Sequence, residues 1–235
     1  MDLESNVWQI KKIDAPEKDP RKAARRVKIL AHEYVSEYEY SFWIDGNLTV
    51  RGNVEELIEQ YMTSTNMAVF DRAQTVYTET WPKFRDVLKK IPGYSVVAKE
   101  TFPAREKVGL TGKNPAAYIN DPINCVYDEA RFLIDRANHG KENIDPIAVQ
   151  KQVDTYRSDG YPEKNGLAIT MVLLRRHNEP DVIKTMQDWW QELNKHTLRD
   201  QLSFNYVAWK NQFSFEYMKG NSRDNKYFLW TPHQG

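Results

Sequence analysis

The tripeptide Asp45-Gly46-Asn47 ends a run of aromatic and apolar residues, 38–47, that the sequence predicts to be a strand. A carboxylate in this position can hold a divalent cation against a diphosphate, because Mg²⁺ and Mn²⁺ prefer oxygen ligands. In α/β proteins, ligands bind beyond the carboxyl ends of strands. The same residues could form a hairpin turn with 48–50 as the returning strand, and the tripeptide alone favours the turn.

Basic residues form one stripe along the helix predicted over residues 20–36: Arg21, Arg25, Lys28 and His32. Lysine and arginine on one helix face can bind phosphate groups. A stripe of this kind is more often the solvated side of an amphipathic helix, and taken alone it favours that interpretation.

Asp200 falls near the start of a helix predicted over 198–210, where the helix dipole favours negative charge. It could act as a base or bind sugar hydroxyls. The spacing from Thr197 also fits a capping box, in which Asp200 accepts a hydrogen bond from the Thr197 backbone N–H. A change of Asp200 to Asn should lower the melting temperature only slightly if Asp200 serves a substrate. Both interpretations stay open.

Other reactive residue types give weaker signals. The five histidines are scattered, and no pair has a zinc-binding spacing. Cys125 is the single cysteine, which excludes an internal disulfide, and it lies in a predicted helix without an obvious base. No Gly-x-Ser-x-Gly motif is present, so nucleophilic catalysis is not indicated. Trp189 has helical spacing with Met186 and Leu193 and is expected in the core.

Strands and helices alternate along the chain, which predicts an α/β layered fold. The expected strands are 6–13, 38–47, 66–70 and 166–176, and the last is an uninterrupted apolar run typical of a buried central strand. The expected helices are 20–36, 53–62, 124–136, 146–158, one opening at 178–180, and 198–210, with short strands in the tail. We interpret 1–235 as a single domain with an insertion at about 73–118, where periodicity is weak.

The composition narrows the class of protein. The 33 Lys and Arg residues balance 33 Asp and Glu residues, which disfavours a nucleic-acid-binding function. No apolar run is long enough for a membrane span, and the first ten residues do not resemble a signal peptide. The single cysteine, Cys125, fits a reducing compartment, so we expect a cytoplasmic protein.

Several blocks in a fixed order resemble one family: RKAARRVKILAHEYVSEYEYSFWIDGN, NCVYDEA, GLAITMVLLRRHN, the Trp pair, LRDQLSFNYVAWK and NKYFLWTPH. The chain resembles the glycosyltransferase-like family long catalogued as a domain of unknown function, found in bacterial surface-polysaccharide loci and plant Golgi proteins. The resemblance covers about 5–71 and 119–233. It implies a GT-A-like α/β sandwich that binds a nucleotide-sugar donor with Mn²⁺ or Mg²⁺ and a glycan acceptor.

The resemblance also implies roles for individual residues. The implied metal ligands are Asp45, Asn47 and a C-terminal histidine, His233. The residues implied to bind the donor are Arg25, Lys28, His32, Asp45 and Gly46. The implied catalytic residues are Arg199, Asp200 and Gln201, at the acceptor side. The residues implied to bind the acceptor are Asp128, Glu129 and His177.

The chain departs from the family pattern at three places. A first strand, turn and helix that usually precede the strand predicted at 6–13 have no counterpart here, so the predicted sheet lacks its first strand. We expect the exposed edge to be covered by 73–118 or by a partner chain. Asp121-Pro122 stands where the family usually has His-Pro, and 73–118 has no recognised counterpart.

Metal-assisted transfer of a sugar from a nucleotide-sugar to a glycan or polysaccharide acceptor is therefore the expected function. One alternative is a non-catalytic GT-A-like domain that binds glycan or protein and lacks a complete nucleotide pocket. A second is a metal-dependent phosphodiesterase or nuclease built on Asp45 and Asp200, which would need a second carboxylate cluster that the sequence does not show.

Overall fold

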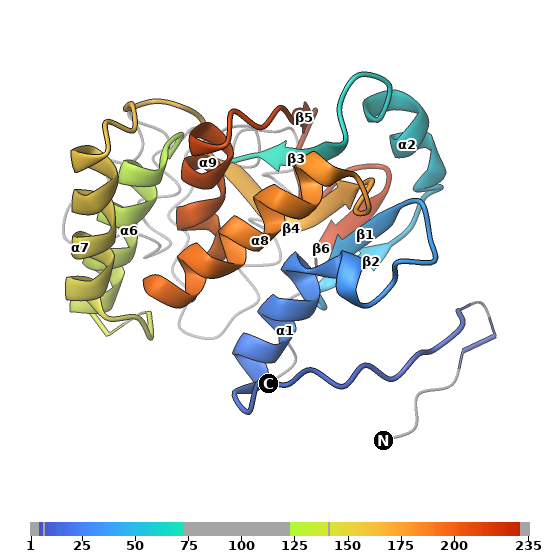
Figure 1. Ribbon diagram of the computed structural model, residues 1–235, viewed down its shortest axis with the longest axis horizontal. Helices are drawn as coiled ribbons and strands as arrows, with labels where there is room; N and C mark the ends of the chain where they lie inside the picture. The colour runs from blue at the N-terminus through green and yellow to red at the C-terminus, as the bar shows by residue number, and fades with distance from the viewer. Residues whose placement is uncertain (1–4, 7, 73–122, 141, 231–235) are drawn as a thin grey trace, which may run out of the picture.

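The computed structural model describes residues 5–6, 8–72, 123–140 and 142–230 and has a mixed α/β architecture (Figure 1). Its main sheet has four strands in the order β1-β4-β3-β5: β1 Ser41–Ile44, β3 Met67–Asp71, β4 Ala168–Arg175 and β5 Glu216–Met218. A second sheet pairs β2, Leu48–Val50, with β6, Phe228–Trp230. The expected α/β class is confirmed.

The direction of the strands places several strand ends at one edge. β4 is antiparallel to both β1 and β3, whereas β3 and β5 are parallel. β1, β3 and β5 therefore run in the same direction, and their carboxyl ends lie at the same edge as the start of β4. We call this side of the molecule the carboxyl edge.

The apolar run at 166–176 forms the central strand β4, as the sequence predicts. Its side chains are almost all buried because strands and helices cover it on both faces. Its pairing with β3 has an irregularity, since Val69 faces Leu173 whereas the next residue, Phe70, faces Ile169. Residues 170–172 therefore leave the β3 ladder.

The predicted strand at 6–13 is wrong. Residues 8–13 have no regular secondary structure, and Trp8, Ile10 and Ile13 are exposed. Figure 1 shows this part of the chain as an extended arm that passes below the sheets in this view. The apolar alternation that suggested a strand has no pairing partner among the described residues.

The helix predicted over 20–36 is shorter in the structure. α1 spans Pro20–Ile29 and is capped by Asp19, whose Oδ1 accepts a hydrogen bond from the Arg21 backbone N–H at 2.8 Å. Proline at the first position suits the fixed helical φ. Leu30 leaves the helical conformation at φ −95° and ψ 47°, and the 3-10 helix Ala31–Glu33 follows.

The hairpin interpretation of Asp45-Gly46-Asn47 is also wrong. The Leu48 N–H donates to Asp45 O at 2.9 Å, so a turn is present, but β2 pairs with β6 rather than with β1. The turn therefore connects two different sheets. Gly46 has no left-handed φ, and a Cβ built on it would meet no atom within 4 Å, so the turn itself does not require glycine.

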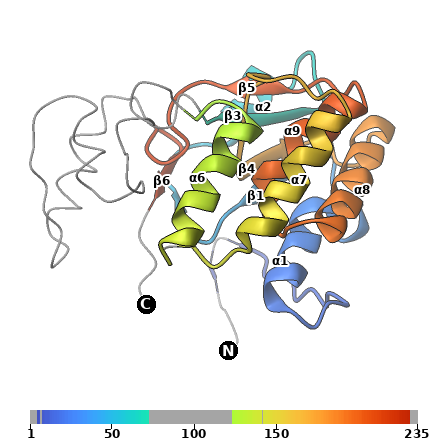
Figure 2. The same cartoon turned by 90° about the vertical axis from the view of Figure 1, so that its left-hand side faces the viewer.

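The helices enclose two apolar cores on opposite faces of the sheet. One core lies under α6 Val126–Asn138, α7 Pro146–Ser158, α8 Pro180–Lys195 and α9 Asp200–Lys210. Figure 2 shows α6 and α7 in front of the sheet. Trp189 is fully buried there, as expected. The other core lies between the sheet, α2 Glu55–Tyr61 and the small β2-β6 sheet.

None of the helices within the described ranges combines the length and the apolar character that crossing a bilayer requires. The insertion expected at 73–118 and the covered sheet edge that depends on it lie outside those ranges.

Candidate functional site

A buried ion pair between α1 and α9 forms the centre of the candidate site. The Nζ of Lys28 lies 2.6 Å from Oδ2 of Asp200, and the two side chains are 1% and 6% exposed. Lys28 occupies the last turn of α1, and Asp200 is the first residue of α9. Ion pairs this deeply buried are uncommon, because removing two charges from water costs several kcal/mol per ion before the partners compensate.

Asp45 joins the pair from the turn after β1. Its Oδ1 lies 3.5 Å from the Nζ of Lys28 and accepts a hydrogen bond from the Trp43 indole N–H at 2.7 Å. Its backbone N–H donates to Met171 O at 2.9 Å, which anchors the turn to β4. The Asp45 side chain is 29% exposed, so Asp45 is the acidic member of the cluster that solvent or a ligand can reach.

The irregularity in β4 delivers a further polar group to the pair. The Thr170 hydroxyl donates to Oδ2 of Asp200 at 3.0 Å. Thr170 lies in the segment that leaves the β3 ladder. Thr170 is not among the site residues expected from the sequence, although a hydroxyl inside a buried apolar strand is a signal that could have pointed to it.

The charges around Asp200 keep it ionised. Burial alone would raise the pKa of this carboxyl, but Lys28 and Arg25 outweigh burial and hold the pKa far below its usual range. Arg25 contributes through its Nε, 3.5 Å from Oδ2. A carboxylate so strongly stabilised as an anion is a poor proton acceptor near neutral pH. This environment favours Asp200 as an anchor for Lys28 over Asp200 as a base.

The capping-box interpretation of Asp200 is wrong. The Thr197 N–H and hydroxyl both donate to Oε1 of Gln152 on α7, at 3.4 and 2.8 Å. Arg199 is the N-cap of α9 and makes no capping hydrogen bond with its side chain. Oδ1 of Asp200 accepts from the Gln201 backbone N–H at 3.1 Å, within the first turn.

Two acidic residues in the first turn of α6, Asp128 and Glu129, have different partners. Oε1 of the buried Glu129 lies 2.9 Å from Nη2 of Arg199, so α6 and α9 are joined by an ion pair. Burial alone would lower the pKa of Arg199, and Glu129 raises it. Asp128 instead caps its own helix, with Oδ2 accepting from the Asn124 N–H and the Cys125 thiol. Their proposed roles toward an acceptor remain predictions.

The structure places His32 and His177 away from the Lys28–Asp200 pair. His177 follows the carboxyl end of β4, where its Nε2 lies 2.9 Å from Val35 O. His32 is a close neighbour of His177 and of the buried Arg175. Thr170 and Arg175 are five residues apart on β4, about 16 Å along a strand. The predicted basic stripe is therefore divided between two places, and His233 lies outside the described residues.

The donor atoms at the site fit a cation that a ligand's phosphates also hold. Asp45 supplies a partly exposed carboxylate with both of its contacts on one oxygen, and Asn47 lies two residues further along the same turn. Mg²⁺ often binds through one or two carboxylates together with substrate phosphates. The described part of the chain contains no group of three His, Cys, Asp or Glu residues able to form an all-protein metal cage.

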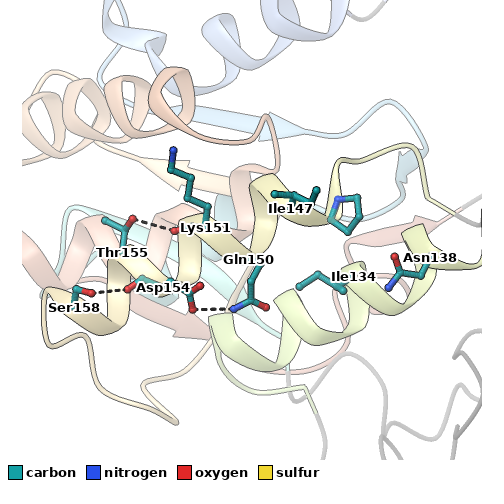
Figure 3. A pocket seen from close by; sticks show the side chains of 9 residues that line it. Ile134, Asn138, Ile147, Gln150, Lys151, Asp154, Thr155 and Ser158 are labelled. Atoms are coloured by element: carbon teal, nitrogen blue, oxygen red, sulfur yellow. Dashed lines mark hydrogen bonds between the residues drawn. The ribbon is translucent and has the colours of Figure 1, made fainter.

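A groove of about 720 Å³ lies elsewhere, between α6 and α7 (Figure 3). Ile134 and Ile147 line it together with polar residues of α7, among which Gln150 donates to Asp154 at 2.8 Å. None of the residues around Lys28 and Asp200 contributes to it. The groove carries no cluster of charged groups comparable to the carboxyl edge and is not part of the candidate site.

The fold and the site together define an α/β domain with a buried ion pair and an accessible carboxylate at the carboxyl edge of its sheet. A comparison with known protein families identifies the family of this domain. The chain belongs to the TOD1/MUCI70 family of glycosyltransferase-like domains, whose family model matches residues 3–90 and 119–226.

The expected family resemblance is therefore confirmed, and membership indicates a role related to glycosyl transfer. The matched ranges include Lys28, Asp45, Thr170 and Asp200. Neither the curated proteins nor the solved structures gave a significant match.

Proposed function

We propose that this domain transfers a sugar from a nucleotide-sugar donor to a glycan acceptor, in a GT-A-like fold and with Mn²⁺ or Mg²⁺. The observation that carries this proposal is the position of Lys28, buried between Asp45 and Asp200 at the carboxyl edge of a glycosyltransferase-like domain. A cation fixed at this edge suits a ligand with phosphate groups.

Lys28 is the proposed electrostatic partner of the donor diphosphate. Asp200 pairs with the Lys28 ammonium group, and Thr170 donates a hydrogen bond to Asp200. The ammonium group is therefore held in place before a ligand arrives. Charge that is already oriented stabilises a leaving diphosphate without the reorganisation that water would need. Arg25, 30% exposed and on the same face of α1, is placed to add a second positive charge.

Asp45 and Asn47 are the proposed protein ligands of the divalent cation, which would neutralise part of the diphosphate charge. Trp43 donates to Oδ1 of Asp45 and thereby restricts the orientation of the carboxylate. Open space at Gly46 leaves the backbone of the turn accessible between these two residues. Arg199 and Gln201 remain proposed contacts of the acceptor side, with Asp200 as a positioning residue.

Calorimetric titration with UDP-, GDP-, CMP- and dTDP-sugars, with and without Mn²⁺, tests the proposal. We expect Mn²⁺-dependent binding of one nucleotide class and release of free nucleotide when a glycan acceptor is added. Asp45→Asn should weaken Mn²⁺-dependent binding by at least about tenfold. Asp14→Asn is the matched control, because its side chain is 88% exposed and lies in the N-terminal arm.

Two results would overturn this function. Binding that is equally tight without metal and in Asp45→Asn would remove Asp45 from the metal site. Failure of all four nucleotide classes to bind the folded chain would favour the non-catalytic, glycan-binding alternative. That alternative has one observation in its favour, the strong stabilisation of the Asp200 anion, which removes the most obvious candidate for a base.

A further inference from the structure

Arg223 lies close enough to Arg72, Arg199 and Glu129 for their charges to act on it. Arg72 directly follows β3, and its N–H donates to Leu167 O at 2.8 Å, which continues the pairing of β3 with the start of β4. Arg199 directly precedes α9, and Arg223 lies in the loop between β5 and β6. The carboxyl edge therefore gathers these side chains from three separate parts of the chain.

Arg199 has donor capacity left after it pairs with Glu129. The ion pair uses Nη2, whereas Nε is buried and has no hydrogen-bond partner. A buried N–H donor without a partner costs free energy, about 1–3 kcal/mol in typical cases. Such a donor beside an accessible surface is satisfied when an acceptor oxygen enters.

Arg223 presents its guanidinium at the surface in a restrained orientation. The guanidinium carbon lies 5.2 Å from the centre of the Trp230 ring, and the Trp230 backbone N–H donates to the Arg223 backbone carbonyl. The two residues therefore contact each other through both their side chains and their backbones. Within the described residues, Arg223 has no carboxylate ion-pair partner. A guanidinium stacked on an indole keeps its N–H edge available for planar, bidentate contact with an oxyanion.

The three positive charges act on one another. Crowding of the Arg223 head group by protein atoms, together with the charges of Arg72 and Arg199, lowers the pKa of Arg223 to about 10, and Glu129 opposes this only weakly. Arg223 is still fully charged at neutral pH. The mutual repulsion means that an anion placed among these side chains would be stabilised by more than one of them.

This group is separate from the proposed donor position. Lys28 and Arg25 approach Oδ2 of Asp200 from α1, whereas Arg199 extends to Glu129 on α6. The two sets of cationic side chains, Lys28 with Arg25 and Arg199 with Arg223, therefore suit two different charged groups.

We propose that Arg199 and Arg223, with Arg72 beside them, bind an oxyanion carried by the acceptor, so that the preferred acceptor is an acidic saccharide with carboxylate or phosphate groups. This inference rests on the proposed glycosyl-transfer function and specifies its acceptor. None of the residues except Arg199 belongs to the site expected from the sequence.

The test compares Arg223→Gln with Arg157→Gln, a matched control on α7 whose side chain is 47% exposed. Arg199→Gln is less suitable because it would leave the buried Glu129 without its ion-pair partner. Three probes are titrated into each folded protein: a glucuronate-containing oligosaccharide, a neutral oligosaccharide of equal length, and UDP with Mn²⁺. A phosphorylated oligosaccharide distinguishes carboxylate from phosphate as the source of the oxyanion.

The wild-type chain and Arg157→Gln should bind an acidic oligosaccharide more tightly than the neutral one. Arg223→Gln should lose about tenfold or more of the affinity for the acidic probe and keep UDP binding within about twofold. Equal binding of acidic and neutral probes, or no loss in Arg223→Gln, would overturn the acidic-acceptor assignment while UDP binding leaves the proposed function intact. Loss of UDP binding in Arg223→Gln would assign the oxyanion to the donor and would also overturn it.

Discussion

Replacing Asp200 by Asn should destabilise the domain substantially, which reverses the small effect expected from the sequence. The substitution removes the charge that lies 2.6 Å from the Nζ of Lys28. The Lys28 side chain, which is 1% exposed, then keeps Asp45, 3.5 Å away, as its remaining acidic neighbour. Breaking a buried pair from one side typically costs about 3–5 kcal/mol. For a domain of this size, each kcal/mol lowers the melting temperature by about 2–4 °C, so the expected drop is about 6–20 °C.

Urea denaturation followed by circular dichroism measures this change in the free energy of unfolding. Asp14→Asn is the control, and its effect should stay within about 0.5 kcal/mol because the side chain is exposed. The double variant Lys28→Met/Asp200→Asn removes the unpaired ammonium as well, so it should recover part of the lost stability. A double variant no more stable than Asp200→Asn would show that the cost arises from packing rather than from the orphaned charge.

The pH dependence provides an independent check of the same pair. The pKa of Asp200 is lower in the folded protein than the value of about 3.9 in an unfolded chain. The stabilisation is therefore complete above the unfolded value and is lost as pH falls toward the folded one. The difference between wild type and Asp200→Asn should be smaller at pH 3 than at pH 7. A loss below about 1 kcal/mol at pH 7, or a difference that does not change with pH, would refute the reasoning.

Two further predictions concern buried groups outside the candidate site. Burial, with a contribution from the charge of Arg175, lowers the pKa of both His32 and His177. The unfolded chain therefore binds more protons, and stability should fall as pH drops below about 6.5. His177→Gln should reduce this dependence between about pH 7 and 5, and an unchanged profile in that variant would count against the prediction. Burial also raises the pKa of the Cys125 thiol, which donates to Asp128, so a disulfide reagent should modify the native chain slowly and the urea-unfolded chain at once; rapid labelling of the native chain would contradict this placement.

Local patterns predicted the elements whose signals lie in short segments. The apolar run at 166–176 indicated the central strand, and Asp145 with Pro146 opens α7 as the predicted helix at 146–158 requires. Hydrophobic periodicity and capping chemistry act over a few residues, so a single sequence shows them directly. The family resemblance followed from blocks of this kind in a fixed order.

These local patterns did not predict which distant segments pair as strands. Residues 6–13 have the alternation of a strand but no partner in the described structure, and 48–50 pairs with the distant β6 rather than with the strand just before it. A strand exists only when another strand satisfies its backbone groups, and alternation does not reveal which segment will do so.

Local sequence patterns pointed to the basic helix, to Asp45 at a strand end and to Asp200 at a helix start, but left each of them with a structural alternative. The tertiary structure decided that Lys28 lies buried between both, that Thr170 joins them from an irregular stretch of β4, and that His32 and His177 lie elsewhere. It also placed Arg72 and Arg199 close enough to Arg223 for their charges to act on it, which no spacing in the sequence indicated. The physical reason is that the sequence determines the charge each side chain can carry, whereas burial and the charges of neighbours distant in the chain determine whether that charge anchors the fold or faces a ligand.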